Sequence, residues 1–199
     1  LVATLFYPYL TISFRQILER VQVMSTSEKA DIISQVQTHR GAHDGPSREF
    51  EVPGAMIFDT FFDYGAFRDL QRHRIMTQIN QPLNIAHGYE VPRDLEAAGG
   101  LERFQKLMET GRAGYEAMTT QFPADALYVI PMAYRKRTLF KMNLREFHHF
   151  VELRSRSGGH FSYRTLVYEM YEQVKAKQPA LVSHLRAVKM DFSADFFGR

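Results

Sequence analysis

Residues 64–74 read Tyr-Gly-Ala-Phe-Arg-Asp-Leu-Gln-Arg-His-Arg, so the last three side chains of this stretch are cationic or can become so. The spacing of Ala66, Leu70 and His73 predicts an amphipathic helix that finishes at this triplet, with the histidine facing inward and an arginine on either side. Cations in a last helical turn also stabilise the helix dipole by about 0.3–1 kcal/mol each, so a purely structural role stays open. A functional site of this composition would suit an anion with an aromatic body, such as a nucleotide cofactor.

The composition indicates a globular protein with one core. With 199 residues, of which 45% are hydrophobic and 24% charged, the chain suits one domain, and we expect that domain to cover residues 1–199. The net charge is only +3, so nucleic acid is not expected as a partner, although a local basic pocket could bind phosphates. The chain has no cysteine, which excludes disulfides, thiolate metal ligands and a cysteine nucleophile.

The sequence gives no signal for a membrane or for export. No apolar run approaches the ~20 residues that span a bilayer. The apolar start of the chain lacks a basic region and is interrupted by Pro8, which argues against a signal peptide. We therefore expect a cytoplasmic location and no membrane partner.

Helical periodicity dominates the chain, and extended segments lie between the helices. The segments with helical spacing or helix caps are residues 11–24, 25–38, 94–121 (with a break at 99–100), 143–154 and 161–177. The apolar segment 55–62 predicts a buried strand, and residues 127–131 and 138–142 are expected as short strands or connectors. Together these patterns predict a mixed α and β fold with long helices toward the C-terminus.

The helix that begins after Asn143 is a second candidate site. Leu144, Phe147 and Val151 form its apolar stripe, and Asn143 is a suitable N-cap. Asn143 and Arg154 are three helical turns apart and share a face, which could hold an extended polar ligand. An ordinary amphipathic helix explains the same residues equally well.

Two further cationic features have simple structural explanations. His160 opens the last long helix, whose N-terminus could bind an anion, although a surface histidine at a helix start is the simpler interpretation. The run 135–137, with Arg154 and Arg156, could bind RNA or phosphate, but a solvated basic face accounts for it more simply.

The usual catalytic motifs are not found in this sequence. It contains no G-x-S-x-G, no P-loop and no G-x-G-x-x-G. His39 and His43 have the spacing of zinc ligands, but Gly41 and its loop lie between them, and the adjacent His148 and His149 point about 100° apart on a helix. We therefore predict no metal site.

These motifs together resemble the flavin-dependent thymidylate synthases. The family signature R-H-R-x-x-S-x-N-E-x-S-x-R-Y is echoed by residues 72–89, and its helix N-x-R-x-x-x-N-F-L-x-L-R by residues 143–154. An upstream element, H-x-S/T-P-F-E-H, is echoed by residues 43–52, and the later A-Q-W-E-I-R by residues 159–164. The resemblance runs from about residue 39 to 164 in the right order and spacing.

The resemblance implies an α+β fold with a central, mostly antiparallel sheet flanked by helices. It implies a homotetramer whose active sites form where several subunits meet. The implied reaction is C5 methylation of a uridylate, either dUMP or, in a variant, UMP. Methylene-tetrahydrofolate would be the one-carbon donor, reduced FAD the hydride source, and NADPH a further co-substrate. No enzyme nucleophile is needed, which agrees with the lack of cysteine.

The resemblance also assigns roles to individual residues. The implied FAD contacts are Arg72, His73, Arg74, Asn143, Arg145 and His149. The implied uridylate contacts are Asp69, Gln81, Arg154 and His160. Among these, Arg154 matches the catalytic arginine that grips the pyrimidine and polarises it for attack at C5.

The chain departs from the family pattern on the phosphate side of the implied pocket. Gln81, or Asn80, stands where the family has a glutamate, and Leu127 stands where it has an arginine; the signature arginine before Tyr89 is also missing. Each lost charge-assisted hydrogen bond to a phosphate is worth about 1.5–3 kcal/mol. The alternative hypothesis is therefore a domain of this fold that binds flavin or forms an oligomer without turnover, as part of a longer protein.

Overall fold

A computed structural model describes residues 1–191, and the chain divides into two compact units. In the first unit, residues 1–58 and 73–77 join the segment from Phe140 onward; the second unit contains residues 59–72 and 78–139. The unit boundaries fall within strands and just after a helix, so neither unit is a continuous piece of sequence. The expectation of one domain over residues 1–199 stays a prediction.

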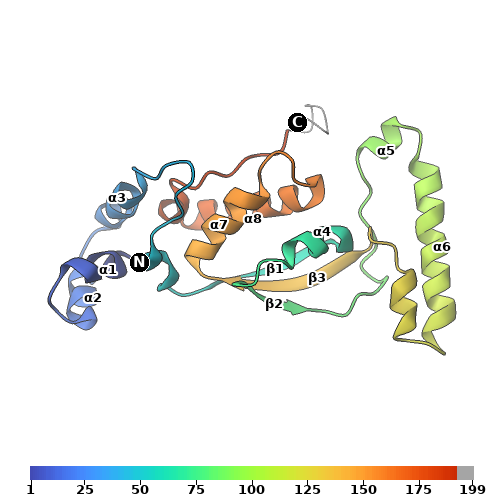
Figure 1. The fold of residues 1–199 in the computed structure, drawn as a ribbon, viewed down its shortest axis with the longest axis horizontal. Helices are drawn as coiled ribbons and strands as arrows, with labels where there is room; N and C mark the ends of the chain where they lie inside the picture. Colours follow the sequence, from blue (N-terminus) through green and yellow to red (C-terminus); the bar gives the residue numbers. More distant parts are fainter. Residues whose placement is uncertain (192–199) are drawn as a thin grey trace. The chain divides into compact units, whose positions relative to one another are not determined.

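Helices make up most of the first unit (Figure 1). They are α1 (Val2–Phe6), α2 (Phe14–Gln22), α3 (Thr26–Gln37), α7 (Leu144–Arg154) and α8 (Phe161–Lys177). Three short 3-10 turns accompany them, at Tyr7–Tyr9, Arg48–Glu51 and Pro179–Val182. The spelling of residues 25–28, Ser-Thr-Ser-Glu, predicts a capping box at the start of α3, and the structure confirms it. Ser25 Oγ accepts the Glu28 N–H at 3.2 Å, and the Glu28 carboxylate accepts the Ser25 N–H at 2.7 Å. Sequence reasoning missed α1, which is too short for a periodic pattern to appear.

Helix α7 buries the apolar stripe that its sequence predicts. Leu144, Phe147 and Val151 are all buried, and the ring of Phe58 stacks on that of Phe147 at 5.6 Å. Helix α8 begins at the predicted residue and packs beside α7 (Figure 1). The core of this unit therefore surrounds α7, and it also encloses three polar side chains of the same helix, Glu146, His148 and Glu152.

The second unit contains most of a three-stranded sheet of order β1-β3-β2. Its strands are β1 (Met56–Asp63), β2 (Thr77–Asn80) and β3 (Arg135–Met142). β3 lies between β1 and β2, and the sheet is antiparallel. At the strand ends the Tyr64 N–H donates to the Tyr134 carbonyl at 2.9 Å and the Gln81 N–H to the Arg137 carbonyl at 3.1 Å. The predicted α+β fold with an antiparallel sheet is confirmed.

Three helices and a 3-10 turn complete the second unit. They are α4 (Tyr64–Leu70), α5 (Asp94–Ala97), α6 (Leu101–Thr119) and the turn Asp125–Val129. The predicted break between two helices is confirmed at residues 99–100, where Gly99 has a positive φ of 67°. In the part of the chain that the structure describes, no helix is both long enough and apolar enough to cross a bilayer.

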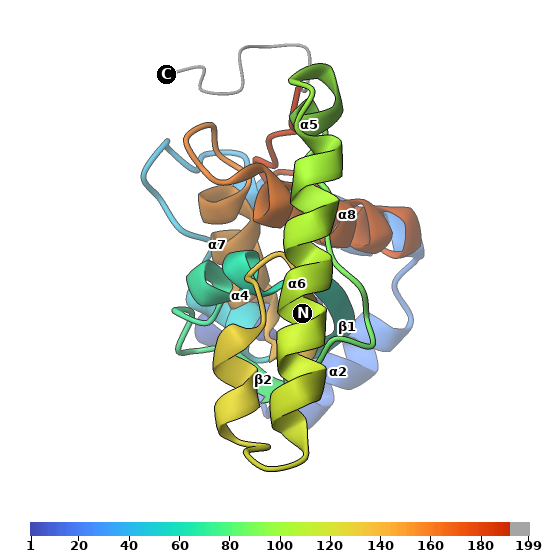
Figure 2. The ribbon, with the colours of Figure 1, turned by 90° about the vertical axis from the view of Figure 1, so that its right-hand side faces the viewer.

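Residues 127–131, expected as a short strand or connector, form no strand and belong to the connection between α6 and β3. A 3-10 turn in this connection runs beside α6 (Figure 2), and a Cβ on Gly111 would lie 2.6 Å from the ring of Pro131. Two local predictions were wrong. Strand β1 is not buried throughout, because exposed and buried side chains alternate over much of it, as in a sheet with one solvent-facing side. Helix α4 ends at Leu70, so the arginine-histidine-arginine triplet follows the helix instead of forming its last turn.

Candidate functional site

His73 lies just after α4, and both of its ring nitrogens bond to side chains of α7. Nδ1 is 3.0 Å from Glu146 Oε1, and Nε2 accepts a hydrogen bond from Arg154 Nε at 2.9 Å. The imidazole and the carboxylate are almost fully buried, with side chains 5% and 4% exposed. The predicted inward orientation of His73 is confirmed. We call Glu146, His73 and Arg154 the His73 cluster.

The hydrogen bonds of the His73 cluster define the tautomer of its imidazole. Arg154 can only donate, so Nε2 of His73 must be the accepting nitrogen and carries no proton. The single ring proton is therefore on Nδ1, where it is donated to the Glu146 carboxylate. The ring of Phe150 packs edge-on against the imidazole at 4.9 Å. The ring is thus fixed by both of these hydrogen bonds together with its aromatic contacts.

Arg154 is held from a second direction by the first turn of α8. Its guanidinium carbon lies 5.6 Å from the ring centroid of Tyr163, a cation–π contact. The ring of Tyr163 approaches Gly159 so closely that a Cβ there would lie 2.7 Å from the phenol oxygen. The catalytic arginine implied by the family resemblance is therefore placed between an imidazole and an aromatic face.

Two predicted histidines lie near this arrangement. His149 is exposed, and its ring centroid is 5.8 Å from that of His73. His160 is the N-cap of α8, where its Nδ1 accepts the Ser162 N–H at 3.4 Å, and its ring is 6.4 Å from that of Tyr163.

Asn143 is the N-cap of α7, as its sequence predicts, and its Oδ1 accepts the Glu146 N–H at 2.8 Å.

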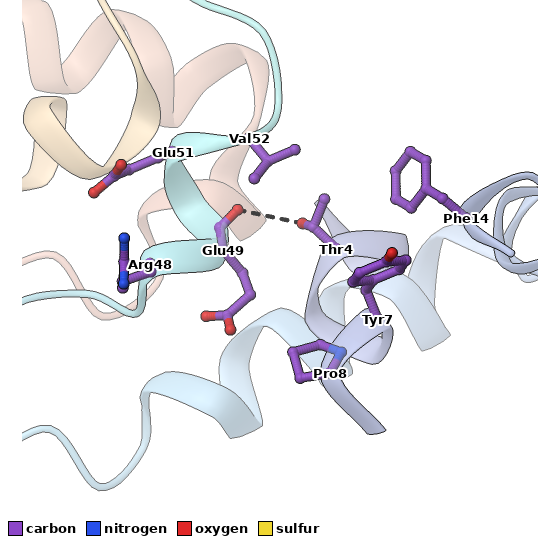
Figure 3. Close-up of a pocket in the computed structure, with 8 residues that line it drawn as sticks. All are labelled: Thr4, Tyr7, Pro8, Phe14, Arg48, Glu49, Glu51 and Val52. Carbon is purple, nitrogen blue, oxygen red and sulfur yellow. Dashed lines mark hydrogen bonds between the residues drawn. The ribbon is translucent and has the colours of Figure 1, made fainter. Parts of the chain in front are cut away.

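Arg145 connects α7 to a cavity in the first unit. Its Nε donates to the Pro46 carbonyl at 3.0 Å, and its Nη1 pairs with Glu51 at 2.5 Å. Glu51 is also one of the residues around a cavity of about 530 Å³. Its walls are formed by Thr4, Tyr7, Pro8, Phe14, Arg48, Glu49, Glu51 and Val52 (Figure 3). The rings of Tyr7 and Phe14 lie on one side and the charged groups of Arg48 and Glu51 on the other, so the cavity has an aromatic end and a charged end.

The remaining predicted residues divide between the two units. Arg74, in the first unit, is exposed and has no charged partner among residues 1–191. Asp69, Arg72 and Gln81 belong to the second unit, where Arg72 pairs with Asp69 at 3.2 Å. The backbone carbonyl of Gln81 accepts a hydrogen bond from Lys136 Nζ at 3.1 Å.

The cations of β3 do not form a continuous basic face. Strand alternation turns Lys136 inward, where burial lowers its pKa, while Arg135 and Arg137 are more exposed. Arg135 pairs with Glu90 at 2.7 Å, and Arg137 forms a bidentate pair with Asp59. Arg135, Lys136 and Arg137 therefore each have a partner, so the run 135–137 that suggested an RNA-binding surface offers no unpaired cation.

A second polar group on α7, the Glu152 cluster, consists of Glu152, Arg40, Arg186 and His148. The Glu152 carboxylate accepts hydrogen bonds from Arg40 at 3.0 Å and from Arg186 at 3.1 Å. Burial alone would raise the pKa of Glu152, but the hydrogen bonds from these arginines outweigh it and hold the pKa below its usual value. Burial lowers the pKa of His148 to about 4.

Sequence reasoning did not single out Glu146, Glu152 or Tyr163. For Glu146 a signal existed, because Glu146, Phe150 and Arg154 follow one another at four-residue intervals on one side of the helix. The partners of Glu152 are 112 and 34 residues away, so no local pattern could reveal them. Within residues 1–191 no three histidine, aspartate or glutamate side chains gather as a metal-binding group.

The comparisons with known proteins agree with these motifs. Residues 9–180 match the sequence model of the thymidylate synthase complementing protein family, Thy1. A UPF0159 protein of Chlamydia muridarum is 41% identical over 142 residues, which cover 71% of this chain and 26% of the relative. A UPF0159 protein of Thermoplasma acidophilum is 32% identical over 190 residues, covering 94% of this chain and 38% of the relative.

A more distant relative carries a functional name. The flavin-dependent thymidylate synthase of Thermococcus onnurineus is 28% identical over 138 residues, covering 61% of this chain and 54% of that protein. The chain spans only about a quarter to two fifths of the length of the two UPF0159 relatives. The match over residues 9–180, which is most of its length, shows that the chain belongs to the thymidylate synthase complementing protein family.

Proposed function

We propose that this chain takes part in flavin-dependent C5 methylation of a uridylate, either dUMP or UMP. The observation that carries the proposal is the 2.9 Å hydrogen bond between His73 and Arg154, which are 81 residues apart. It brings the arginine-histidine-arginine motif to the end of α7, and these are the two elements that the family resemblance assigns to the flavin and to the pyrimidine.

The residues of the first unit fit an FAD. Arg74 and His149 are exposed near the His73 cluster, and Arg145 is fixed beside a cavity with an aromatic end and a charged end. A flavin nucleotide combines an aromatic ring system with a diphosphate, so it needs apolar walls and cations. Tyr7 and Phe14 supply an apolar wall, but the charged end of the cavity combines Arg48 with the carboxylates of Glu49 and Glu51, so we assign the diphosphate to the exposed Arg74. We assign FAD binding to His73, Arg74, Asn143, Arg145 and His149 of the first unit and, from the family resemblance alone, to Arg72 of the second unit. When bound and reduced by NADPH, FAD would supply the hydride of the reaction.

Arg154 is assigned to the uridylate. In the proposed reaction the methylene carbon of methylene-tetrahydrofolate forms a bond to C5, its bonds to the folate nitrogens break so that tetrahydrofolate leaves, and the C5 proton is lost. The hydride that reduced FAD would supply then completes the methyl group. A guanidinium fixed by His73 and Tyr163 can hold the pyrimidine and stabilise negative charge that develops on it. Asp69, Gln81 and His160 are assigned to the same substrate, in active sites that form between the subunits of a homotetramer.

Flavin binding is the first test of this function. Adding FAD at tens of micromolar should raise the thermal midpoint of the protein and quench flavin fluorescence. Incubation with deuterium-labelled methylene-tetrahydrofolate, NADPH, FAD and either dUMP or UMP should then yield a labelled 5-methyl nucleotide by mass spectrometry. An unchanged midpoint and unchanged fluorescence would refute the proposal.

A second candidate is a domain of this family that binds flavin or forms an oligomer without turnover. Gln81 lacks the carboxylate found in the family signature, and Leu127 replaces an arginine expected near the phosphate. Because the chain spans a minor part of its UPF0159 relatives, the assay should include the longest form of the protein that can be expressed. FAD binding without any methyl transfer favours this candidate, and labelled product eliminates it.

A further inference from the structure

We propose that Glu146 is a positioning residue for Arg154. It fixes the His73 proton on Nδ1, so that Nε2 can accept the Arg154 Nε–H and hold the guanidinium in place. The inference rests on the proposed function for its purpose, since Arg154 is the residue assigned to the uridylate. Glu146 is not among the positions that the family resemblance assigns.

The first argument comes from the N-terminus of α7. In α2 and α3 the residue three positions after the N-cap serves a complete capping box, as Glu28 does by returning to the Ser25 N–H at 2.7 Å. Glu146 occupies the same position after Asn143, and its own N–H is capped at 2.8 Å. Among the described residues its side chain makes no return bond to Asn143 and reaches His73 instead. Its carboxylate is thus committed to the imidazole and not to the helix start.

The second argument is the direction of the hydrogen bonds. If the His73 proton were on Nε2, an N–H would face the N–H of Arg154 and the 2.9 Å contact would be repulsive. An ionised carboxylate can only accept hydrogen bonds. Because Glu146 Oε1 lies 3.0 Å from Nδ1, it stabilises the tautomer of His73 that carries its proton on Nδ1. A carboxylate that orients a functional imidazole in this way is a common device in protein sites.

The third argument is burial. The side chains of His73 and Glu146 are 5% and 4% exposed, so water cannot easily replace either hydrogen bond. Without an acceptor at Nδ1 the ring can rotate or change tautomer, and Arg154 loses the contact at its Nε. The cation–π contact with Tyr163 does not fix the rotation of the guanidinium by itself, because it lacks the directionality of a hydrogen bond.

Imidazole 15N NMR on histidine-labelled protein tests this proposal, with the His73 signals assigned by a His73→Asn variant. In the unaltered protein, Nδ1 of His73 should carry the proton and Nε2 should show the shift of an unprotonated, hydrogen-bonded nitrogen. Glu146→Leu should move His73 to mixed tautomers, shift or broaden the Arg154 Nε–H signal, and weaken UMP and dUMP binding about tenfold. Glu146→Gln should restore much of the affinity, because its amide oxygen can still accept the Nδ1 proton.

Glu152→Gln is the matched control, because it changes another buried glutamate of the same helix. It should leave the His73 and Arg154 signals and the uridylate affinity unchanged. Should Glu146→Leu not fold, Glu146→Asp replaces it: the shorter carboxylate retracts from Nδ1, and the same spectral changes are expected. A His73 proton found on Nε2 in the unaltered protein overturns the proposal. The proposal also fails if Glu146→Leu and Glu146→Asp give the same His73 and Arg154 signals and the same uridylate affinities as the unaltered protein. If neither UMP nor dUMP binds the unaltered protein while the spectra change as expected, the positioning role stands and the proposed function fails.

Discussion

The His73 cluster and the Glu152 cluster each combine a glutamate of α7 with histidine and arginine, but their histidines are used differently. His73 stands between a carboxylate and a guanidinium and bonds to charged side chains through both ring nitrogens. The imidazole of His148 does not bond to Glu152; its Nε2 donates to the Leu181 carbonyl at 2.8 Å. Its Nδ1 has no hydrogen-bond partner among residues 1–191.

This difference indicates that the His73 cluster serves ligand binding and that the Glu152 cluster connects segments of the chain to α7. In the Glu152 cluster the arginines bond directly to the carboxylate, so their charges are used to tie the segments around residues 40–44 and 186 to α7. In the His73 cluster a neutral ring separates Glu146 from Arg154, so the carboxylate orients the guanidinium without pairing with it directly. Changes in the Glu152 cluster should therefore alter stability, and changes in the His73 cluster should alter ligand binding.

The largest effect is expected from Glu152→Leu. It leaves Arg40, whose side chain is only 9% exposed, without its carboxylate. An uncompensated buried charge of this kind destabilises a protein by about 4 kcal/mol. Urea unfolding at pH 7 measures the loss, and the FAD affinity of the folded fraction should stay the same. Wild-type stability in this variant would show that the cluster does not tie the chain together.

Arg154→Ala should have the next largest effect, and it should fall on ligand binding. Losing a fixed guanidinium that holds an anionic ligand costs about 100-fold in affinity. Calorimetric titration with dUMP and UMP measures this loss, while FAD binding should be spared. Arg156→Ala is the control, because Arg156 lies two residues away and its Nε donates to the Glu152 carbonyl at 3.0 Å. Equal loss of FAD and uridylate binding in Arg154→Ala would indicate unfolding and contradict the assignment.

His148 should make stability depend on pH. Its pKa is lowered from 6.5 to about 4 in the folded protein, so the unfolded chain binds more protons between these values. Stability is therefore constant above pH 6.5 and falls as the pH drops toward 4, by about 2 kcal/mol between pH 7 and pH 5. His148→Gln, which can still donate to the Leu181 carbonyl, should flatten this slope in urea unfolding. His149→Gln, on the exposed side of the helix, should retain it; equal slopes in the unaltered protein and His148→Gln would contradict the argument.

Much of the fold can be predicted from the sequence because its helices carry local signals. The capping box of Ser25 and Glu28 and the cap at Asn143 place two helix starts, and the stripe of Leu144, Phe147 and Val151 gives the buried face of α7. The turn at residues 125–129 could not be predicted in this way. Its shape depends on how residues 129–131 pack against α6, which is a tertiary contact that overrides the local apolar pattern.

The candidate site was predictable only in part. The inward position of His73 follows from its spacing with Ala66 and Leu70, even though α4 ends before the triplet. The partner of His73 was missed because a glutamate three residues after an asparagine cap usually serves that cap. Only the tertiary structure shows that Glu146 turns away from this role, since His73 lies 73 residues earlier in the chain.

The smallest effect is expected for an ion pair outside both clusters, the bidentate contact of Arg137 with Asp59 in the second unit. The hydrogen bond from Arg137 lowers the pKa of Asp59, but both side chains are nearly half exposed and water screens their attraction. Arg137→Ala should change the melting temperature by about 1 °C or less in calorimetry, and that change should shrink further in 0.5 M salt. Uridylate binding should not respond. A large drop in uridylate affinity would place Arg137 in the site and show that an exposed arginine paired with a carboxylate can bind the ligand as well as the half-buried Arg154 that His73 holds.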